Sequence, residues 1–76
     1  MKITYDPYAD ALYFYAKKGV VKNTKEVNGD ILVDFDAKNK LLGIEILDTS
    51  KKIPKKDLKS VDLQVYLEKP RLLLDS

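Results

Sequence analysis

Short runs of alternating apolar and polar residues recur along most of the chain and predict a β-sheet built from hairpins. In the first hairpin, a four-residue loop at 7–10 brings apolar residues of both strands onto one face. The expected pairs are Ile3 with Phe14 and Tyr5 with Leu12. Asp6 precedes Pro7, so its carboxylate is expected to accept backbone N–H bonds of the loop, as at a helix N-cap. Asp10, at the end of the loop, has no equally clear structural role.

Asn28 and Gly29 indicate a second hairpin, because both residues tolerate the positive φ of a two-residue type I′ turn. This turn places Val27 opposite Asp30 on the adjacent strand. The same register sets polar residues beside apolar ones, namely Glu26, Thr24 and Lys22 beside Ile31, Val33 and Phe35. A strand that is polar even on its partner's buried side, with lysines along it, is typical of a sheet edge.

The third hairpin is expected to have a two-residue turn at Lys38 and Asn39, with Asn39 in the left-handed conformation. This choice follows from the requirement that apolar side chains meet across the pair of strands. The expected pairs on the apolar face are Phe35 with Leu42, Val33 with Ile44 and Ile31 with Ile46. The expected pairs on the opposite face are Asp34 with Gly43 and Leu32 with Glu45.

The pattern changes after Asp48. Pro54 stands where a helix would start, and good helix formers follow it, which predicts one short helix near residues 54–60. Residues 61–68 alternate again and predict a half-buried strand that ends at Pro70. The expected fold is α+β and mainly β: a single small antiparallel sheet, a meander of hairpins with five to six strands, and one short helix.

Length and composition limit the functions to consider. The 76 residues suffice for a single domain over 1–76. Cys and His are absent, which excludes disulfides, thiolate nucleophiles, zinc-finger sites and imidazole acid–base chemistry. No secretory signal pattern or membrane-spanning apolar run is present, so we expect a soluble cytoplasmic protein without membrane contact. No motif for a cofactor or a catalytic group is present, and we expect neither.

The second face of the predicted sheet carries the candidate acidic residues. By the registers above it presents Thr4, Tyr13, Tyr15, Leu32, Asp34, Asp36, Leu41, Glu45 and Leu47. The acids Asp34, Asp36 and Glu45 are candidates to hold a hard cation or to donate a proton with a raised pKa, and Asp10 is a further candidate. Alternatively, these acids pair with lysines or solvent. No calcium-binding loop, glycine-rich phosphate loop or nucleophile elbow accompanies them.

A lysine-rich segment stands out from a chain with a net charge of only +2. Its lysines are Lys51, Lys52, Lys55, Lys56 and Lys59. Such a cluster is either a phosphate-binding patch for nucleic acid or a solvated connector. The connector is favoured, because no arginine or aromatic residue is interleaved to stack on bases.

Three motifs occur in the order "MKITYDPYADALYFY", "ILVDFD" and "LLGIEILDTSKK". From Met1 to about Ile53 they resemble the YuzE-like family of small bacterial and archaeal proteins, the domain of unknown function 2283. Lys38 and Asn39 stand where the family pattern often carries Asp-Gly. The resemblance implies a compact β-rich domain over 1–53, no established activity, and an association of some members with toxin–antitoxin pairs. Residues 54–76, the expected short helix, strand and tail, lie outside the resemblance.

Three classes of function remain open at this point. The favoured one is a non-catalytic protein-interaction module, for which the resemblance implies an antitoxin-like role beside a protein partner encoded nearby. The second is a nucleic-acid-binding protein that uses the lysines of segment 51–59. The third is a small ligand- or metal-binding protein, or an enzyme, that uses the carboxylates of the second face.

We also expect a homodimer, because a chain this small has a limited core and carries apolar groups outside it. The interface candidates are Tyr13, Tyr15, Leu32, Leu41, Leu47, Leu72, Leu73 and Leu74. In the alternative arrangement, residues 54–76 fold back over the second face and leave a monomer.

Overall fold

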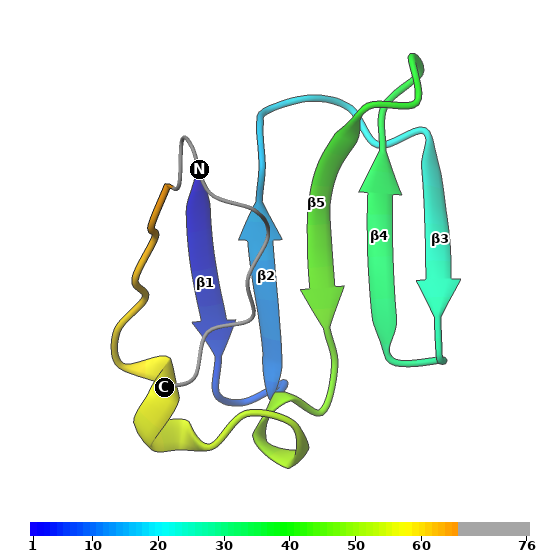
Figure 1. Cartoon of the computed structure of the whole chain (residues 1–76). Coiled ribbons are helices and arrows are strands. Elements are labelled where there is room, and N and C mark those ends of the chain that lie inside the picture. Colours follow the sequence, from blue (N-terminus) through cyan, green and yellow to red (C-terminus); the bar gives the residue numbers. More distant parts are fainter. Residues whose placement is uncertain (66–76) are drawn as a thin grey trace.

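The structure of the chain is a computed structural model, which describes residues 1–65. These residues form a five-stranded sheet in which every neighbouring pair of strands is antiparallel (Figure 1). The strands are β1 (Lys2–Asp6), β2 (Ala11–Tyr15), β3 (Asn23–Val27), β4 (Ile31–Phe35) and β5 (Leu41–Ile46). The expected mainly β fold with a single antiparallel sheet is therefore confirmed.

The strand order, β1-β2-β5-β4-β3, differs from the simple succession of a meander. After β2 the chain crosses one end of the sheet through residues 16–22 and starts β3 at the far edge (Figure 1). Strands β4 and β5 then return, so that β5 pairs with both β4 and β2. The mostly apolar β5 suits this central place, whereas the polar β3 is exposed along its whole length. The expected edge position of the polar strand is confirmed.

The first hairpin has the predicted register and loop. Its pairs include Ile3 with Phe14 and Tyr5 with Leu12. In the loop at 7–10, Oδ1 of Asp6 accepts the backbone N–H of Tyr8 at 2.9 Å and that of Ala9 at 3.2 Å. The capping role expected of Asp6 before Pro7 is therefore confirmed.

The register predicted for the second hairpin is wrong by one residue. Val27 pairs with Ile31 and not with Asp30, so the loop has three residues instead of two. Asn28 and Gly29 do adopt the left-handed conformation, with φ angles of 56° and 76°. The observed register brings two apolar residues together, which is the criterion that also selects the register of the third hairpin.

Asp30 leaves the β3–β4 ladder because it binds the chain that follows β5. Its carbonyl accepts the backbone N–H of Leu47 at 2.8 Å, and its carboxylate pairs with Nζ of Lys52 at 2.7 Å. As a consequence, Glu26 lies opposite Leu32 and Thr24 opposite Asp34, one position away from their expected partners.

The register of the third hairpin is confirmed over most of its length. The confirmed pairs are Ile31 with Ile46, Leu32 with Glu45, Val33 with Ile44 and Asp34 with Gly43. An irregularity between Asp34 and Phe35 then shifts the register, so Phe35 lies opposite Leu41 and not opposite Leu42. A β-bulge of this kind adds one residue to a single strand and bends it.

The turn of the third hairpin is longer than the predicted two residues. The backbone N–H of Asp36 bonds to the carbonyl of Lys40 at 2.9 Å and closes the turn. Oδ1 of Asp36 also accepts the backbone N–H groups of Lys38 at 2.9 Å and Lys40 at 2.8 Å. Asn39 has the expected left-handed conformation, with φ at 61°. The Asp36 side chain therefore organises a wider turn that the local pattern of apolar residues did not reveal.

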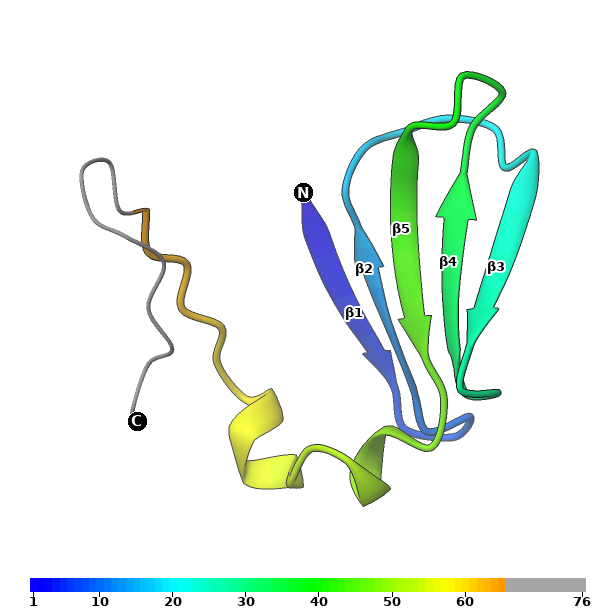
Figure 2. The same cartoon turned by 45° about the vertical axis from the view of Figure 1, so that its right-hand side comes forward.

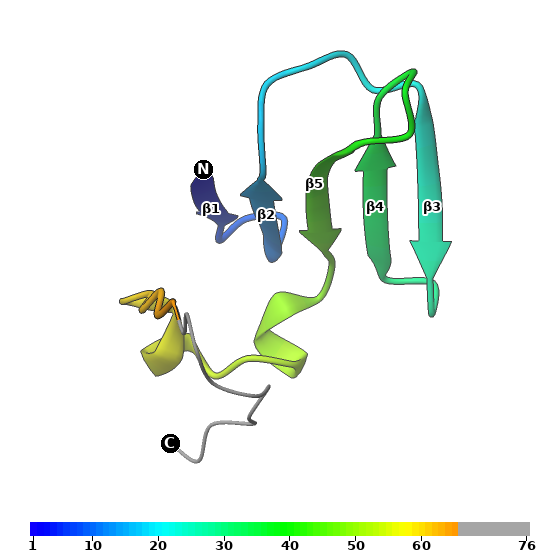
Figure 3. The same cartoon turned by 45° about the horizontal axis from the view of Figure 1, so that its top comes forward.

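Two short 3₁₀ helices follow the sheet, η1 (Thr49–Lys51) and η2 (Lys55–Leu58). Pro54 directly precedes η2, which agrees with the short helix expected near residues 54–60. Residues 61–65 then run on the β1 side of the sheet without forming a strand (Figures 2 and 3). The remainder of the strand predicted at 61–68 lies outside the described residues. No helix within residues 1–65 is long and apolar enough to span a membrane.

Candidate functional site

One surface of the sheet, here called the apolar face, crosses all five strands. Its residues are Ile3, Tyr5, Leu12, Phe14, Val27, Ile31, Val33, Ile44 and Ile46, as the strand registers place them. Most of these side chains are half-buried, and Ile3 and Val27 at the two edges are 41% and 43% exposed. Within residues 1–65, Leu42 is the only hydrophobic side chain that is fully buried, at 4% exposed. The described residues therefore do not cover the apolar face as the inside of a closed core would be covered.

The segment after β5 reaches the apolar face at its β1–β2 side. A hollow of about 320 Å³ there is lined by Ile3, Tyr5 and Leu12 of the sheet and by Ile53, Leu58 and Val61 of the segment. The described residues of this segment therefore lie at the apolar face. They do not fold over the opposite face, as the expected monomeric alternative required. Its side chains Val61, Leu63 and Val65 remain 70%, 73% and 72% exposed, so they pack little against the sheet.

The opposite surface, here called the mixed face, holds a hydrogen-bonded group that spans four strands. The hydroxyl of Tyr13 on β2 donates to Oδ2 of Asp34 on β4 at 2.5 Å. The hydroxyl of Thr24 on β3 donates to the other oxygen of Asp34 at 2.6 Å. The Tyr13 side chain passes over Gly43 of β5, where an added Cβ would lie 2.5 Å from the Tyr13 ring. Gly43 therefore provides the space that lets Tyr13 reach Asp34.

Burial, followed by the hydrogen bond to Asp34, raises the pKa of Tyr13 from 10.0 to about 12. Because the folded chain holds this proton more tightly than the unfolded chain, the contribution of Tyr13 to stability is complete below pH 10. It is lost as the pH rises toward about 12. We therefore expect the stability advantage of the native chain over Tyr13→Phe, measured by thermal unfolding, to shrink across this interval.

The control for this titration is Tyr8→Phe, since Tyr8 is 100% exposed. Its stability should follow that of the native chain at every pH. A constant difference between the native chain and Tyr13→Phe up to pH 12 would contradict the raised pKa of Tyr13.

A cleft of about 540 Å³ opens on the mixed face next to Tyr13. The rings of Tyr13 and Tyr15 lie 4.4 Å apart between centroids, and Nζ of Lys2 lies 4.6 Å from the centroid of the Tyr15 ring. Leu42 and the loop at 16–22 complete the cleft. An ammonium group this close to an aromatic ring is attracted to the ring face. The cleft thus combines an aromatic and aliphatic lining with a cationic rim.

The acids expected on the second face do not form one site. Asp34 and Glu45 do lie on the mixed face, but Asp36 lies in the turn after β4 and pairs with Nζ of Lys17 at 2.9 Å. Hydrogen bonds from the backbone of Lys40 and then from Lys17 lower the pKa of Asp36. Among residues 1–65, no group of three acids is placed to hold a metal ion.

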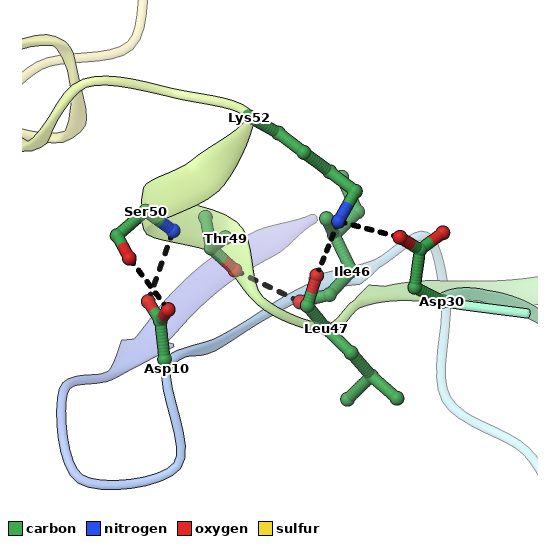
Figure 4. Close-up of polar contacts among 7 residues, drawn as sticks. All are labelled: Asp10, Asp30, Ile46, Leu47, Thr49, Ser50 and Lys52. Atoms are coloured by element: carbon green, nitrogen blue, oxygen red, sulfur yellow. Dashed lines mark hydrogen bonds and ion pairs between the residues drawn. The ribbon is translucent and has the colours of Figure 1, made fainter.

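Asp10 lies at the opposite end of the sheet and ties the first hairpin to η1 (Figure 4). Its Oδ1 accepts the Tyr5 hydroxyl at 2.7 Å and the backbone N–H of Ser50 at 3.0 Å, and its Oδ2 accepts the Ser50 hydroxyl at 2.7 Å. The Asp10 carbonyl accepts the backbone N–H of Thr49 at 2.9 Å. The bonds from the hydroxyls of Ser50 and then Tyr5 lower the pKa of Asp10. Asp10 therefore has a structural role across a sequence separation of 40 residues.

The sequence of the chain can be compared with those of known proteins. A family described as a protein of unknown function (DUF2283) matches residues 2–50, which is more than half of the chain. The chain belongs to this family. The match to DUF2283 includes the whole sheet, the Tyr13–Asp34 bond and the Asp10–Ser50 contact, and it ends just before the lysine-rich segment.

One relative of the chain is an uncharacterized protein of Methanocaldococcus jannaschii, which is 43% identical to it over 51 residues. The aligned part is 67% of this chain and 43% of that protein, so the chain spans less than half of its relative's length. No solved structure matches the chain. Membership of DUF2283 therefore indicates that residues 2–50 form one conserved unit of the family, and it assigns no activity to the chain.

The lysine-rich segment lies outside the DUF2283 match and is partly engaged within the chain. Nζ of Lys52 pairs with Asp30 at 2.7 Å and donates to the carbonyl of Leu47 at 2.8 Å (Figure 4). Lys51 ends η1, Lys55 and Lys56 lie in η2, and Lys59 follows it. Lys52, at least, therefore stabilises the fold and is not only a solvated side chain.

The interface candidates are divided by the structure. Tyr13, Tyr15 and Leu32 share the mixed face, whereas Leu41 lies opposite Phe35 beyond the bulge and Leu47 follows β5. Leu72, Leu73 and Leu74 lie outside the described residues.

One cationic surface was missed by sequence reasoning because its members are scattered along the chain. They are Lys2, Lys17, Lys18, Lys22, Lys38 and Lys40. All of them lie where β1, β3 and β5 begin or where β2 and β4 end, which is one and the same end of the sheet (Figure 1). In an antiparallel sheet every second connection lies at the same end. The lysines of the alternate connections would therefore have revealed this lysine end.

Proposed function

We propose that this chain is a non-catalytic protein-interaction module that binds its partner through the apolar face. The observation that carries the proposal is the width of this face, which extends over all five strands while the described residues after β5 reach only its β1–β2 side. A sheet with one apolar face gains stability when a second layer removes that face from water. A partner surface would supply this layer.

A second copy of the chain is the occupant that fits best. The apolar face consists of aliphatic and aromatic side chains, and Lys25, opposite Val33 on the edge strand, is the one charged residue that the described registers add to it. Such a surface offers little charge complementarity to a different partner, whereas obligate homodimer interfaces are more apolar than transient ones. Two sheets packed face to face, about 10 Å apart and related by a two-fold axis, would bury both faces at once.

The carboxylates support a non-catalytic role. Asp34 accepts two hydroxyl hydrogen bonds, Asp36 binds its own turn and Lys17, and Asp10 binds Tyr5 and Ser50. Each of these three carboxylates is bound to neighbouring donors of the fold. A general acid or a cation site would instead need these oxygens directed at a substrate or an ion.

Light scattering at micromolar concentration is expected to give about twice the chain mass of 8.7 kDa. Ile3→Lys places a charge on the exposed rim of the apolar face and should shift the mass toward that of the single chain, because a lysine there would be desolvated in the dimer. Thr4→Lys is the matched control: it lies next to Ile3 on β1, is also exposed, and pairs with Tyr13 on the mixed face. It should leave the dimer intact.

A mass of 8.7 kDa for the native chain would reject the second copy as the occupant. The module would then have a different protein partner, and an antitoxin-like role is one form of this outcome. Co-purification of the product of a neighbouring gene with the native chain, but not with Ile3→Lys, would identify it. Circular dichroism of both variants checks that the sheet is folded.

A further inference from the structure

The lysine end of the sheet has a strong excess of positive charge. Its six lysines are all exposed, and Asp36 is the one acid that the described residues contribute to this end. That acid is already bound to Lys17 at 2.9 Å and to the backbone of its own turn. Among residues 1–65, Lys17 is the one lysine of this end that forms an ion pair, and lysines clustered in this way attract phosphate groups.

The aromatic cleft of the mixed face opens at this same end. Tyr15 is 40% exposed, so part of its ring is accessible, and Tyr13 beside it is held in place by Asp34. Lys2, Lys17 and Lys18 stand around the two rings. Aromatic rings beside cationic groups are the combination on which bases stack while phosphates are neutralised.

A second hollow, of about 360 Å³, continues from the cleft along the end of the sheet. Lys17 and Gly19 line both hollows. Lys22 and Lys38 line the second, together with Asp36, which is paired with Lys17. The cationic groups therefore follow a path across the sheet end and do not converge on one point. A path of this kind suits a chain of phosphates better than the single phosphate cluster of a free nucleotide.

From this arrangement we propose a further function: the lysine end binds single-stranded nucleic acid, with a base stacked in the cleft on Tyr15 and the phosphates along the lysines. A duplex fits less well, because a paired and stacked base has no exposed ring face to lie on Tyr15. The site is separate from the apolar face, so it is independent of the proposed protein interaction.

The test is fluorescence anisotropy of the full chain with a labelled mixed-sequence oligonucleotide, in RNA and DNA form, at low salt. Tyr15→Ala should weaken binding by roughly tenfold or more, as for other stacked bases. Tyr15→Phe should bind like the native chain, because stacking needs only the ring. Lys18→Ala should lower the slope of log K against log salt by about 0.7, the value for one phosphate contact on a single strand.

Two control variants distinguish this site from general surface charge. Tyr8→Ala removes a fully exposed tyrosine in the loop at the opposite end, and Lys56→Ala removes a lysine of η2. Neither should change the affinity. An equal loss in Lys56→Ala and Lys18→Ala would show that general surface charge, and not the lysine end, causes the binding, and it would overturn the proposal.

Two other results would also overturn it. One is the absence of binding to any oligonucleotide at low salt by a chain that circular dichroism shows to be folded. The other is binding of a free nucleotide or a duplex as tightly as the single strand. Circular dichroism of Tyr15→Ala separates a lost stacking contact from a lost fold.

Discussion

Replacing Gly43 with alanine is expected to destabilise the sheet by about 1 to 3 kcal/mol, the usual cost of forcing extra volume into a packed site. A Cβ at this position would lie 2.5 Å from a ring carbon of Tyr13 and 2.6 Å from the carbonyl oxygen of Phe14. The Phe14 contact is with backbone of the neighbouring strand β2, so a change of side-chain rotamer cannot relieve it. Urea unfolding monitored by circular dichroism measures the loss.

Gly19→Ala is the matched control for this substitution. Its Cβ would also come close to a neighbour, 2.6 Å from Cδ2 of Leu42, but this atom is the end of a flexible side chain. Gly19→Ala should therefore cost less than Gly43→Ala. A neutral Gly43→Ala would show that β2 and β5 have room at Gly43 and that Tyr13 does not need the glycine beneath it. Equal losses would contradict the argument that the backbone contact is harder to relieve than the side-chain contact.

Asp10→Asn is expected to lower stability more than removal of the loop cap by Asp6→Ala, for which about 1 kcal/mol is expected. Three donors, from Tyr5 and Ser50, point at the two carboxylate oxygens of Asp10. An asparagine offers one acceptor oxygen and turns an N–H donor toward at least one of these donors, while it still tolerates the left-handed φ of 52° at this position. The measurement is the midpoint of thermal unfolding at neutral pH.

The same pair of proteins tests the pKa of Asp10. The hydrogen bonds from Ser50 and Tyr5 lower this pKa below 3.8, so the stability that Asp10 contributes is present above pH 3.8 and is lost as the pH falls through the lower, folded value. The difference between the native chain and Asp10→Asn should therefore narrow only in strong acid. A difference that stays the same through the acid range below pH 3.8 would contradict a charged Asp10 as the group that joins the first hairpin to η1.

Taken together, the two faces of the sheet have different chemistry and suit different partners. The apolar face offers aliphatic and aromatic area with Lys25 as the one charged residue of the described registers, and the lysine end offers cationic groups around Tyr13 and the partly exposed ring of Tyr15. Strand β5 links them, because Ile44 and Ile46 contribute to the apolar face while Gly43 makes room for Tyr13 on the mixed face. Ile3→Lys on the apolar face and Tyr15→Ala in the cleft therefore separate the two proposed functions.

The strands and the first hairpin follow from the sequence alone. Alternation of apolar residues is a local property, and it places Tyr5 with Leu12 and Val33 with Ile44 as the structure has them. The residues with positive φ at the turns, Asn28 and Asn39, were also predictable, since few other residue types tolerate that conformation. These features depend on neighbours only a few positions away.

Loop lengths were predicted less well, because side chains from elsewhere in the fold decide them. Asp30 is drawn out of the β3–β4 ladder by Leu47 and Lys52, which belong to the segment after β5. Asp36 binds the backbone of its own turn and extends it. An apolar pattern contains no information on such polar contacts, so it gave each of these turns too few residues.

Only the tertiary structure decided the strand order, and with it both proposed binding surfaces. The insertion of β5 between β2 and β4 joins two hairpins into one wide apolar face, and the crossing at residues 16–22 brings scattered lysines to one end. The contact of Asp10 with Ser50 likewise spans 40 positions. Each of these features depends on which strands are neighbours, and that choice is made by the free energy of the whole sheet and not by any local run of residues.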